Sequence, residues 1–576
     1  MNTDTIALLD KHFDLAVNAP DGIKRLREMI LTLAMQGKLV PQDPKDQPAS
    51  ELLKEIEAEK KRLVKEGKIK EPKPLPPIKP EEVPYEVPES WVFCVLGNVA
   101  LLITKGSTPT SYGFSFLDSG IPFIKVENVK NGSIQFTDKM QFISDEAHTF
   151  QKRSQLEKDD LLFSIAGTIG ETCIVKESDV PANINQALAI IRGYNTAFLP
   201  DFLIKCLNSS VARKVKERAR GGAMYNISLG DINEMMLPLP PLVEQRRIVA
   251  KIDELMARVD ELERKRGARK EKRLAMHQAA IARLLDAEDA TASRSGRDFI
   301  FAHFADLYGT KQNVAELRKA ILQLAVMGRL VPQDPKDQPA SELLKEIEAE
   351  KKRLVQEGKI KEPKLLPPIK PEEVPYQVPK GWEWVRLGDI SDFFNGDRSK
   401  NYPNREEYVE FGIPWINTGH IEPDGSLSQS EMNFISREKF DSLSGGRIQK
   451  GDLVYCLRGA TLGKVAFVEP YKEGAIASSL MIIRTVSLLY LRYVYQYLIG
   501  PLGRSQIFRF DNGSAQPNLS ANNVQLYVFP LPPLAEQHRI VTKVDELMAL
   551  CDKIDKQIDE RTEKESALLE AVAARV

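Results

Sequence analysis

The sequence VPQDPKDQPASELLKEIEAEKKRLV occupies Val40–Val64 and recurs without a change at Val331–Val355. The match continues as far as Trp91 and Trp382, and over that length the first copy differs only at Lys65, Pro74, Glu86, Glu89 and Ser90. A long internal repeat marks a chain built from related structural units. We therefore expect two half-proteins in tandem.

A second pair of matching segments closes each half. PLPPLVEQRRIVAKIDELMA begins at Pro238, and PLPPLAEQHRIVTKVDELMA begins at Pro530. In both, apolar residues recur at alternating spacings of three and four, which is typical of a coiled-coil seam. We expect the two exit helices to pair with each other. A helix over residues 243–285 would be about 60 Å long at the usual rise per residue.

The entry segment of each half predicts two helices and a stiff connector. In the first half, the spacing of apolar residues indicates a helix over residues 25–36 that ends at Gly37. Ser50 is placed to cap a second helix over residues 51–66, and Gly67 to end it. The proline-rich sequence that follows favours an extended connector.

The two middle segments, residues 92–236 and 383–528, differ in sequence but keep one order of elements. Each contains short apolar runs typical of buried strands, such as DLLFSIAG from Asp160 and DLVYCLRG from Asp452. Each also contains a helical stretch, which we expect over residues 200–220 in the first and near residues 488–507 in the second.

These patterns predict a mixed α/β (α+β) fold. Two globular domains are separated by conserved long helices that form an antiparallel coiled coil, in a pseudo-twofold tandem repeat. The expected boundaries are 1–85 for an N-terminal helical region and linker, 86–236 for the first domain, 237–300 for a central helix, 301–376 for the repeated helical region and linker, 377–528 for the second domain, and 529–576 for a C-terminal helix.

The composition is that of an ordinary folded protein. Hydrophobic residues make up 42% and charged residues 28% of the 576 residues, and no run of 18 apolar residues occurs. The first residues lack the basic and apolar regions of a secretion signal. Five scattered cysteines without a C-x-x-C pair favour reduced thiols. We expect a cytoplasmic protein with no membrane contact and no bound metal.

Sequence motifs for catalysis are missing. The sequence has no G-x-x-x-x-G-K-[ST], H-E-x-x-H or G-x-S-x-G motif. Its double-proline sites, LPPI and LPPL, lack the flanking residues of a DNA adenine methyltransferase loop. A nuclease pattern could be drawn only from Pro20-Asp21 and Glu59-Lys60-Lys61, a spacing that arises by chance on a charged helix. We predict that the chain catalyses no reaction by itself.

The net charge of −1 does not favour nucleic acid, but binding depends on where the charges lie. Two segments concentrate basic residues: ARKVKERARGG, which contains Arg213–Arg220, and ERKRGARKEKR, residues 263–273. Each would also suit a solvated helix face.

Four motifs in a fixed order resemble those of the specificity subunit of type I restriction–modification enzymes. They are VPYEVPESWVFCVLG or VPYQVPKGWEWVRLG, then GIPFIKVENV or GIPWINTGHI, then a strand and turn like GDLVYCLRGATLG, then PLPPLVEQRRIV, and the resemblance covers nearly the whole chain. It implies that the middle segments are target recognition domains, each reading one half of a split double-stranded DNA sequence, and that the repeated helices set the spacing.

The same resemblance implies the partners and cofactors. Two methyltransferase subunits dock on the repeats, and motor/endonuclease subunits complete the restriction complex. No cofactor is expected in this chain, while S-adenosylmethionine, ATP and magnesium are expected on the partner subunits.

Loop residues with polar or basic side chains are the candidates for DNA contact, since such groups read base edges and hold phosphates. In the first domain they are Lys105, Ser107, Thr108, Lys125, Asn128, Lys130, Asn131, Thr168, Arg220, Tyr225 and Asn226. In the second they are Asn395, Arg398, Ser399, Lys400, Asn417, Thr418, His420, Arg458, Thr461, Asn512, Gln516 and Asn518. Phe123 and Trp415, which follow Gly-Ile-Pro, are expected in the core. No catalytic or metal-binding residue is predicted.

A hypothesis of another class stays open. The chain could be a non-catalytic adaptor whose two variable domains bind different proteins. Retention of one split DNA sequence by the assembled complex, with steep salt dependence, would distinguish DNA recognition from this alternative.

Overall fold

The computed structural model describes residues 19, 21–72, 74–130, 132–209, 226–285, 290–360, 362, 365–486, 488–510 and 519–573. The chain divides into two compact units, residues 1–269 with 561–576, and residues 270–560. Each unit holds the entry segment and the middle segment of one half, together with parts of the long exit helices. The two half-proteins expected from the repeat are therefore two structural units.

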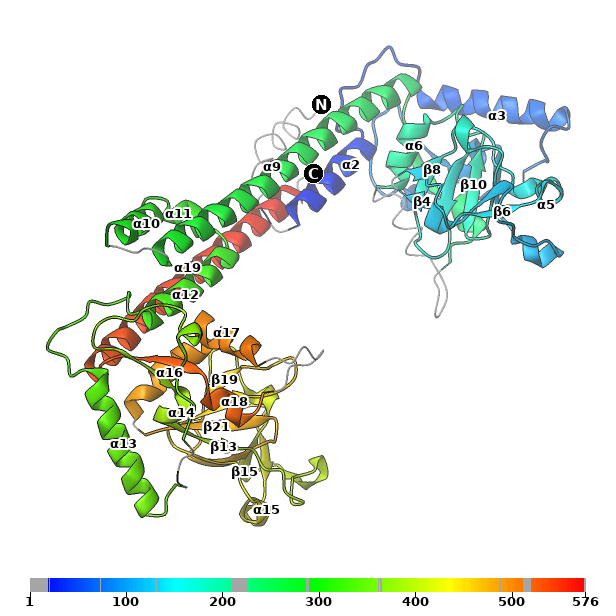
Figure 1. Cartoon of the computed structure of the whole chain (residues 1–576). Helices are drawn as coiled ribbons and strands as arrows, with labels where there is room; N and C mark the ends of the chain where they lie inside the picture. Colours follow the sequence, from blue (N-terminus) through cyan, green and yellow to red (C-terminus); the bar gives the residue numbers. More distant parts are fainter. Residues whose placement is uncertain are drawn as a thin grey trace. The chain divides into compact units, whose positions relative to one another are not determined.

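Unit 1 begins with helices and continues into a domain of short strands (Figure 1). Its elements are α2 Gly22–Met35, α3 Ala49–Lys65, β1 Val92–Val95, α4 Leu96–Val99, β2 Leu102–Lys105, β3 Ile121–Ile124, β4 Val129–Lys130, β5 Ser133–Ile134, β6 Gln141–Ile143, α5 Asp145–Phe150, β7 Leu161–Ser164, β8 Thr172–Ile174, β9 Asn183–Ile184, β10 Leu188–Arg192, α6 Pro200–Leu207, α8 Leu229–Asn233 and β11 Met236–Leu239. Helix α9, Leu242–Leu285, then leads into unit 2.

Unit 2 repeats this order with additions. Its elements are α10 Ala290–Ala302, α11 Phe304–Leu307, α12 Lys311–Val326, α13 Ala340–Gln356, β12 Glu383–Arg386, α14 Leu387–Ile390, β13 Ser391–Asn395, β14 Tyr408–Val409, β15 Ile413–Ile416, β16 Asn433–Ile435, α15 Arg437–Ser442, β17 Arg447–Gln449, β18 Asp452–Cys456, β19 Val465–Phe467, β20 Glu473–Ile476, β21 Leu480–Thr485, α16 Leu488–Ile499, α17 Pro501–Arg509, α18 Ala521–Gln525 and β22 Val528–Leu531. Helix α19, Leu534–Ala573, leads back into unit 1.

Each middle segment forms a domain around an antiparallel four-stranded sheet. In the first middle domain (residues 92–236) the strand order is β2-β10-β7-β8, and in the second (residues 383–528) it is β13-β21-β18-β19. A further sheet accompanies each: β6-β3-β9 in the first and β14-β16-β15-β20-β17 in the second. The two domains thus share a strand plan despite their divergent sequences.

The four-stranded sheets are buried on both faces, which explains why their strands are continuous apolar runs. On β7, Leu161 and Phe163 belong to the hydrophobic cluster that includes α6. Leu162, between them, belongs to a second cluster with Ile124 of β3 and Val129 of β4. Strand β18 divides its side chains between two clusters in the same alternating way. The predicted strands are confirmed.

The entry and exit of each middle domain are joined by a two-stranded sheet. Strand β1 pairs antiparallel with β11, with Val92 opposite Leu239, and β12 pairs with β22, with Glu383 opposite Leu531. Each middle segment therefore begins and ends at the same place, next to the repeated segments. Its interior can change while its ends stay fixed.

A buried glutamate at the start of each exit helix holds the entry segment in place. Glu244 is 1% exposed and accepts hydrogen bonds from Trp91 Nε1 at 2.9 Å and Gln42 Nε2 at 2.6 Å. Burial raises the pKa of this carboxyl, and the two hydrogen bonds oppose the shift. Arg247 on the next turn of the helix pairs with Asp46 at 2.6 Å. The repeated sequence VPQDPKD thus contacts the exit helix.

The same contacts recur in unit 2. Glu536 accepts from Trp382 Nε1 at 2.9 Å and from Gln333 Nε2 at 3.0 Å, and Arg539 pairs with Asp337 at 2.6 Å. Both partners of each contact lie in the repeated segments. Packing within each unit is therefore sufficient to explain why these residues are the same in the two copies.

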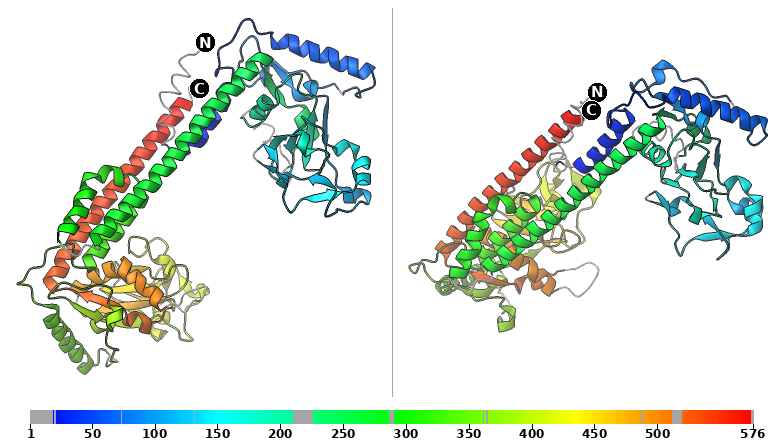
Figure 2. Two further views of the ribbon diagram at one scale, coloured as in Figure 1. Left: turned by 45° about the horizontal axis from the view of Figure 1, so that its top comes forward. Right: turned by 90° about the horizontal axis from the view of Figure 1, so that it is seen from above.

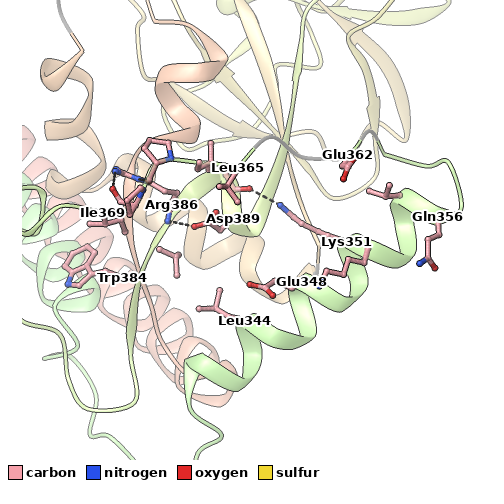
Figure 3. Close-up of a pocket in the computed structure, with 17 residues that line it drawn as sticks. Leu344, Glu348, Lys351, Gln356, Glu362, Leu365, Ile369, Trp384, Arg386 and Asp389 are labelled. Carbon is pink, nitrogen blue, oxygen red and sulfur yellow. Dashed lines mark hydrogen bonds between the residues drawn. The ribbon is translucent and has the colours of Figure 1, made fainter.

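A buried lysine attaches each charged entry helix to its middle domain. Lys60 of α3 donates to the carbonyl oxygens of Gly97, Asn98 and Ala100 at 2.7–3.0 Å. Lys351 of α13 donates to Gly388 O at 2.9 Å (Figure 3). Burial lowers the pKa of both ammonium groups. An ammonium group beside carbonyls at the end of a short helix is a favourable arrangement.

The exit helices pack first against the entry helix of their own half. Figures 1 and 2 show α2 lying along the first part of α9, where Arg27 pairs with Asp260 at 2.6 Å and Glu263 at 2.8 Å. In unit 2, Arg318 of α12 pairs with two aspartates of α19 in the same way.

Helices α9 and α19 both contribute to the hydrophobic cluster of each unit. The end of α19 adds Leu569 to the cluster of unit 1, and the end of α9 adds Ala280 to that of unit 2. They run in opposite directions, since α9 leads from unit 1 to unit 2 and α19 leads back. The expected antiparallel association is present, but each seam has a third helix as a partner.

Three predicted helix boundaries are wrong. Helix α3 begins at Ala49 after Pro48, and Ser50 provides no cap. The helix expected over residues 200–220 begins as α6 but already ends at Leu207, and residues 210–220 of that expectation lie outside the described residues. The helix expected near residues 488–507 is two helices, α16 and α17, separated at Gly500-Pro501, because proline cannot donate the hydrogen bond needed to continue a helix.

We predict that Asp452→Ala lowers the free energy of unfolding of unit 2 by about 3 kcal/mol, because it strands a largely buried guanidinium. Asp452 is 1% exposed and binds Arg484 through two hydrogen bonds of 2.7 Å. Urea denaturation followed by tryptophan fluorescence measures the change. Glu473→Ala, which breaks an exposed pair with Arg437, is the matched control and should have little effect. Equal effects of the two variants would contradict the prediction.

Candidate nucleic-acid interface

Three loops of the first middle domain converge on residues 185–187, between β9 and β10. The loops follow β2, β3 and β7; the candidate Lys105 ends β2, and the candidates Lys125 and Thr168 lie in the loops after β3 and β7. The contacts are Asn185 N to Ile124 O at 3.0 Å, Ile165 N to Ala187 O at 2.9 Å, and Thr108 Oγ1 to Gln186 Oε1 at 2.6 Å. Candidates from distant parts of the sequence are therefore neighbours.

The second middle domain has the same arrangement around residues 477–479, between β20 and β21. Loops after β13, β15 and β18 meet there and carry the candidates Arg398, Asn417 and Arg458. The contacts are Asp397 N to Ile476 O at 3.3 Å, Ala477 N to Ile416 O at 2.8 Å, and Leu457 N to Ser479 O at 2.9 Å. Both domains thus present three loops at one end of the four-stranded sheet.

A fourth segment reaches the same place in each domain. Ile227 N donates to Ile165 O at 2.9 Å, and Leu519 N donates to Leu457 O at 3.0 Å. Asn226 is exposed and forms a β-bridge with Ala166. The candidates Asn131, Arg220, Tyr225, Asn512, Gln516 and Asn518, and the basic segment Arg213–Arg220, lie outside the described residues.

Several cations on or next to these loops have no carboxylate partner among the described residues. The side chains of Lys105, Lys130, Arg398, Lys400 and Arg458 are exposed, and none forms an ion pair with another described residue. By contrast, Arg27, Arg247, Arg318 and Arg539 of the repeated segments are paired with carboxylates. A cation that is not neutralised within the protein can neutralise a phosphate.

Two candidates have structural roles instead. Asn128 is 5% exposed and accepts a hydrogen bond from Lys125 N at 2.9 Å. His420, its counterpart, is 4% exposed and accepts from Asn417 N at 3.1 Å. Burial lowers the pKa of His420. Because both side chains are used to close their own loops, we leave them out of the proposed DNA contacts.

The remaining candidates are partly engaged within the loops. Lys125 lies 5.8 Å from the ring of Phe116 and 4.0 Å from Glu127. Asn417 Oδ1 accepts from Gly419 N at 2.8 Å, and Thr461 Oγ1 contacts Cys456 Sγ at 3.3 Å. Thr168 and Asn395 are exposed, and Ser107 and Thr418 are half-buried. Phe123 and Trp415 are each 1% exposed, which confirms their place in the core.

Glycine allows the loop after β2 to lie close to the segment before β10, and the loop after β13 to lie close to the segment before β21. A Cβ at Gly106 would stand 2.1 Å from Ile184 O, and a Cβ at Gly396 would stand 2.0 Å from Ala477 O. Both distances are too short for any side chain. These two glycines occupy equivalent places, directly after Lys105 and two residues before Arg398.

The sequence analysis missed the polar residues on which the loops converge, in residues 185–187 and 477–479. Gln186 is exposed and held by Thr108, while Ser478 and Ser479 are half-buried. It also missed Asp397, whose carboxylate ties two loops together. The signal for the first group was a polar pair just before a largely apolar strand: Asn185-Gln186 stand one residue before LAIIR, and Ser478-Ser479 stand directly before LMIIR.

A hollow in unit 2 lies away from these loops, between α13, the proline-rich connector and β12 (Figure 3). Leu344, Leu365 and Trp384 line it together with charged side chains. Its central cation, Arg386, is 3% exposed, pairs with Glu373 at 2.5 Å and donates to the carbonyls of Pro367 and Pro368 at 3.1 Å. Arg386 therefore serves to hold the connector against the domain.

Neither a metal site nor a membrane-spanning helix is found among the described residues. They contain no cluster of three or more His, Cys, Asp or Glu side chains that could hold a metal ion. No helix in the part of the chain that the structure describes is long and apolar enough to cross a membrane.

Comparison with known proteins gives one consistent family. The sequence model of the type I restriction modification DNA specificity domain matches residues 88–269 and again residues 379–564. The type I restriction enzyme EcoAI specificity subunit of Escherichia coli is 35% identical over 92% of this chain and 90% of that protein. The EcoEI specificity subunit of Escherichia coli is 29% identical over 96% of this chain and 93% of that protein.

A solved structure also aligns with the chain. The HsdS subunit from Thermoanaerobacter tengcongensis is 18% identical, and the alignment covers 85% of this chain and 98% of that one with a TM-score of 0.43.

We predict that Gly396→Ala destabilises unit 2 by about 2 kcal/mol, because the added methyl group meets backbone atoms that cannot move aside. Gly445→Ala is the matched control: it lies in the neighbouring loop, and its Cβ would be 3.9 Å from the nearest atom, Asn395 O. Urea denaturation of both variants tests the prediction. A stable Gly396→Ala protein would show that the loop does not need this close approach.

Proposed function

Because the chain belongs to the type I restriction–modification DNA specificity family, we propose that it binds a bipartite target in double-stranded DNA, with each middle domain reading one half-site. The observation that carries this proposal is the convergence of polar loops at equivalent ends of both domains, with cations that form no ion pair with another described residue. Loops of this kind can combine phosphate contacts with base contacts, and rigid sheets beneath them fix their positions.

The divergence of the two domains supports separate reading. The two central strands of each four-stranded sheet stay largely apolar in both domains, whereas the loop candidates change from Lys105 to Asn395 and from Thr108 to Arg398. Different donors and acceptors at equivalent places would select different bases. The two half-sites should therefore differ in sequence.

We further propose that the chain directs other subunits and performs no catalysis itself. Two methyltransferase subunits and motor/endonuclease subunits would carry S-adenosylmethionine, ATP and magnesium. The repeat supports two copies of one partner: exposed residues of α3, such as Glu51, Lys54 and Lys61, recur on α13, although packing within the unit does not require them. Unpaired thiols at all five cysteines fit action in the cytoplasm.

The test is to map methylated adenines in DNA from cells that carry the complete system. We expect one split motif with an unread spacer. Purified complex should retain a duplex with that motif, and its affinity should fall steeply with salt, because phosphate contacts release counterions. A complex that modifies DNA without any sequence preference would contradict the proposal. Selective binding of other proteins by the two domains, with no preferred duplex, would favour the adaptor hypothesis.

A further inference from the structure

Asp397 lies at the base of the loop that carries Arg398 and Lys400. Its side chain is buried, with 1% exposure, although both neighbouring cations are exposed. Neither cation forms an ion pair with it or with another described residue. A buried carboxylate requires hydrogen-bond donors, and the donors identify what it holds together.

The carboxylate of Asp397 accepts five hydrogen bonds from two loops. Oδ1 accepts from Ser399 N at 2.9 Å and Ser399 Oγ at 2.7 Å, within its own loop. Oδ2 accepts from Ser444 N at 2.8 Å, Ser444 Oγ at 3.0 Å and Gly445 N at 3.2 Å, in the loop after α15. Burial works against ionisation, but these hydrogen bonds outweigh it and hold the pKa of Asp397 below its usual value.

Further contacts fasten the same two loops. Asn401 Nδ2 donates to Ser442 O at 2.8 Å, and Asn401 N donates to Ser399 Oγ at 3.2 Å. Arg447 Nη2 donates to the carbonyls of Asp441 and Leu443 at 2.9 and 3.1 Å, which fixes the end of α15. The loop after α15, which contains Ser444, is therefore held in place by several hydrogen bonds. Asp397 connects the loop of Arg398 and Lys400 to it.

We propose that Asp397 is a positioning residue of the second domain, which sets the direction from which Arg398 and Lys400 approach the DNA. This role rests on the proposed function and deepens it. A loop that is already ordered loses less conformational entropy on binding, and it offers its donors in one geometry only. Discrimination between bases depends on that geometry, whereas general attraction to phosphates depends mainly on charge.

The first domain fixes its equivalent loop by other means. Gly106 matches Gly396, but Ser107 stands where Asp397 would be, and no hydrogen bond of its side chain links it to another described loop. There, Thr108 bonds to Gln186 and Pro109 is buried. A change at Asp397 should therefore affect one half-site only.

The chain offers a matched control. Asp424 begins a similar Asp-x-Ser turn, and its Oδ1 accepts from Ser426 N at 2.9 Å and Ser426 Oγ at 2.6 Å. Among the described residues, no second loop donates to its carboxylate. Asp424→Asn removes the same charge and disturbs the same local turn, but it breaks no link between loops.

The experiment compares the assembled complexes of wild type, Asp397→Asn and Asp424→Asn on duplexes that carry single substitutions in either half-site. We expect Asp397→Asn to lose about tenfold in discrimination at one or two base pairs of the second half-site, the usual value of a good base contact. Discrimination in the first half-site, and the salt dependence of binding, should stay as in wild type, because Arg398 and Lys400 are still present. Asp424→Asn should behave as wild type.

Three results would overturn the inference: wild-type discrimination by Asp397→Asn, an equal loss in both half-sites with a lower unfolding temperature, or the same loss in Asp424→Asn. If Asp397→Asn does not fold, Ser444→Ala removes a single donor to the same carboxylate and should show a weaker loss confined to the second half-site. A wild-type complex without any split preference would overturn the proposed function itself, which distinguishes that failure from the failure of Asp397.

Discussion

The structure depends on the closure of each middle domain between its entry and its exit. Glu244 and Glu536 are each 1% exposed, and each accepts from a tryptophan indole and a glutamine amide of the entry segment. A carboxylate buried in this way is stable only with its donors in place. The paired strands β1 and β11, and β12 and β22, lie next to these contacts and complete the closure. Together they allow the sequence between them to vary without moving the ends of the domain.

This constraint explains part of the identity between the two copies of the repeat. Gln42, Asp46 and Lys60 each contact the exit helix or the middle domain, and their counterparts Gln333, Asp337 and Lys351 do the same. The exposed residues of α3 make no contacts of this kind, so packing does not explain why they are repeated on α13. Selection by a common partner would preserve both faces, and a recent duplication would also leave them identical. The specificity lies between the repeats, in loops that share a scaffold but differ in their polar residues.

Much of the fold could be predicted because its physical causes are local. Strands β7 and β18 are buried on both faces, so they appear as apolar runs, and Gly37 and Gly67 end helices with the positive φ that glycine tolerates. The third helix in each exit seam, α2 in unit 1 and α12 in unit 2, could not be predicted, since a heptad pattern shows which face is buried but not everything that covers it. Asn128 and His420 looked like loop residues open to DNA, and only the structure shows that they are buried. Asp397 escaped notice because its donors at Ser444 and Gly445 are distant in sequence.

The central claim is that the repeated segments form a frame that does not determine the DNA sequence, and that each middle domain reads its own half-site. It is tested most directly by a chain in which residues 387–527 are replaced by residues 96–235 of the same protein, so that both frames carry the first domain. The measurement is the methylated motif in cells that express this chain with its partner subunits. The account predicts a split motif in which both halves carry the sequence of the first half-site. A motif that keeps the original second half-site would contradict it.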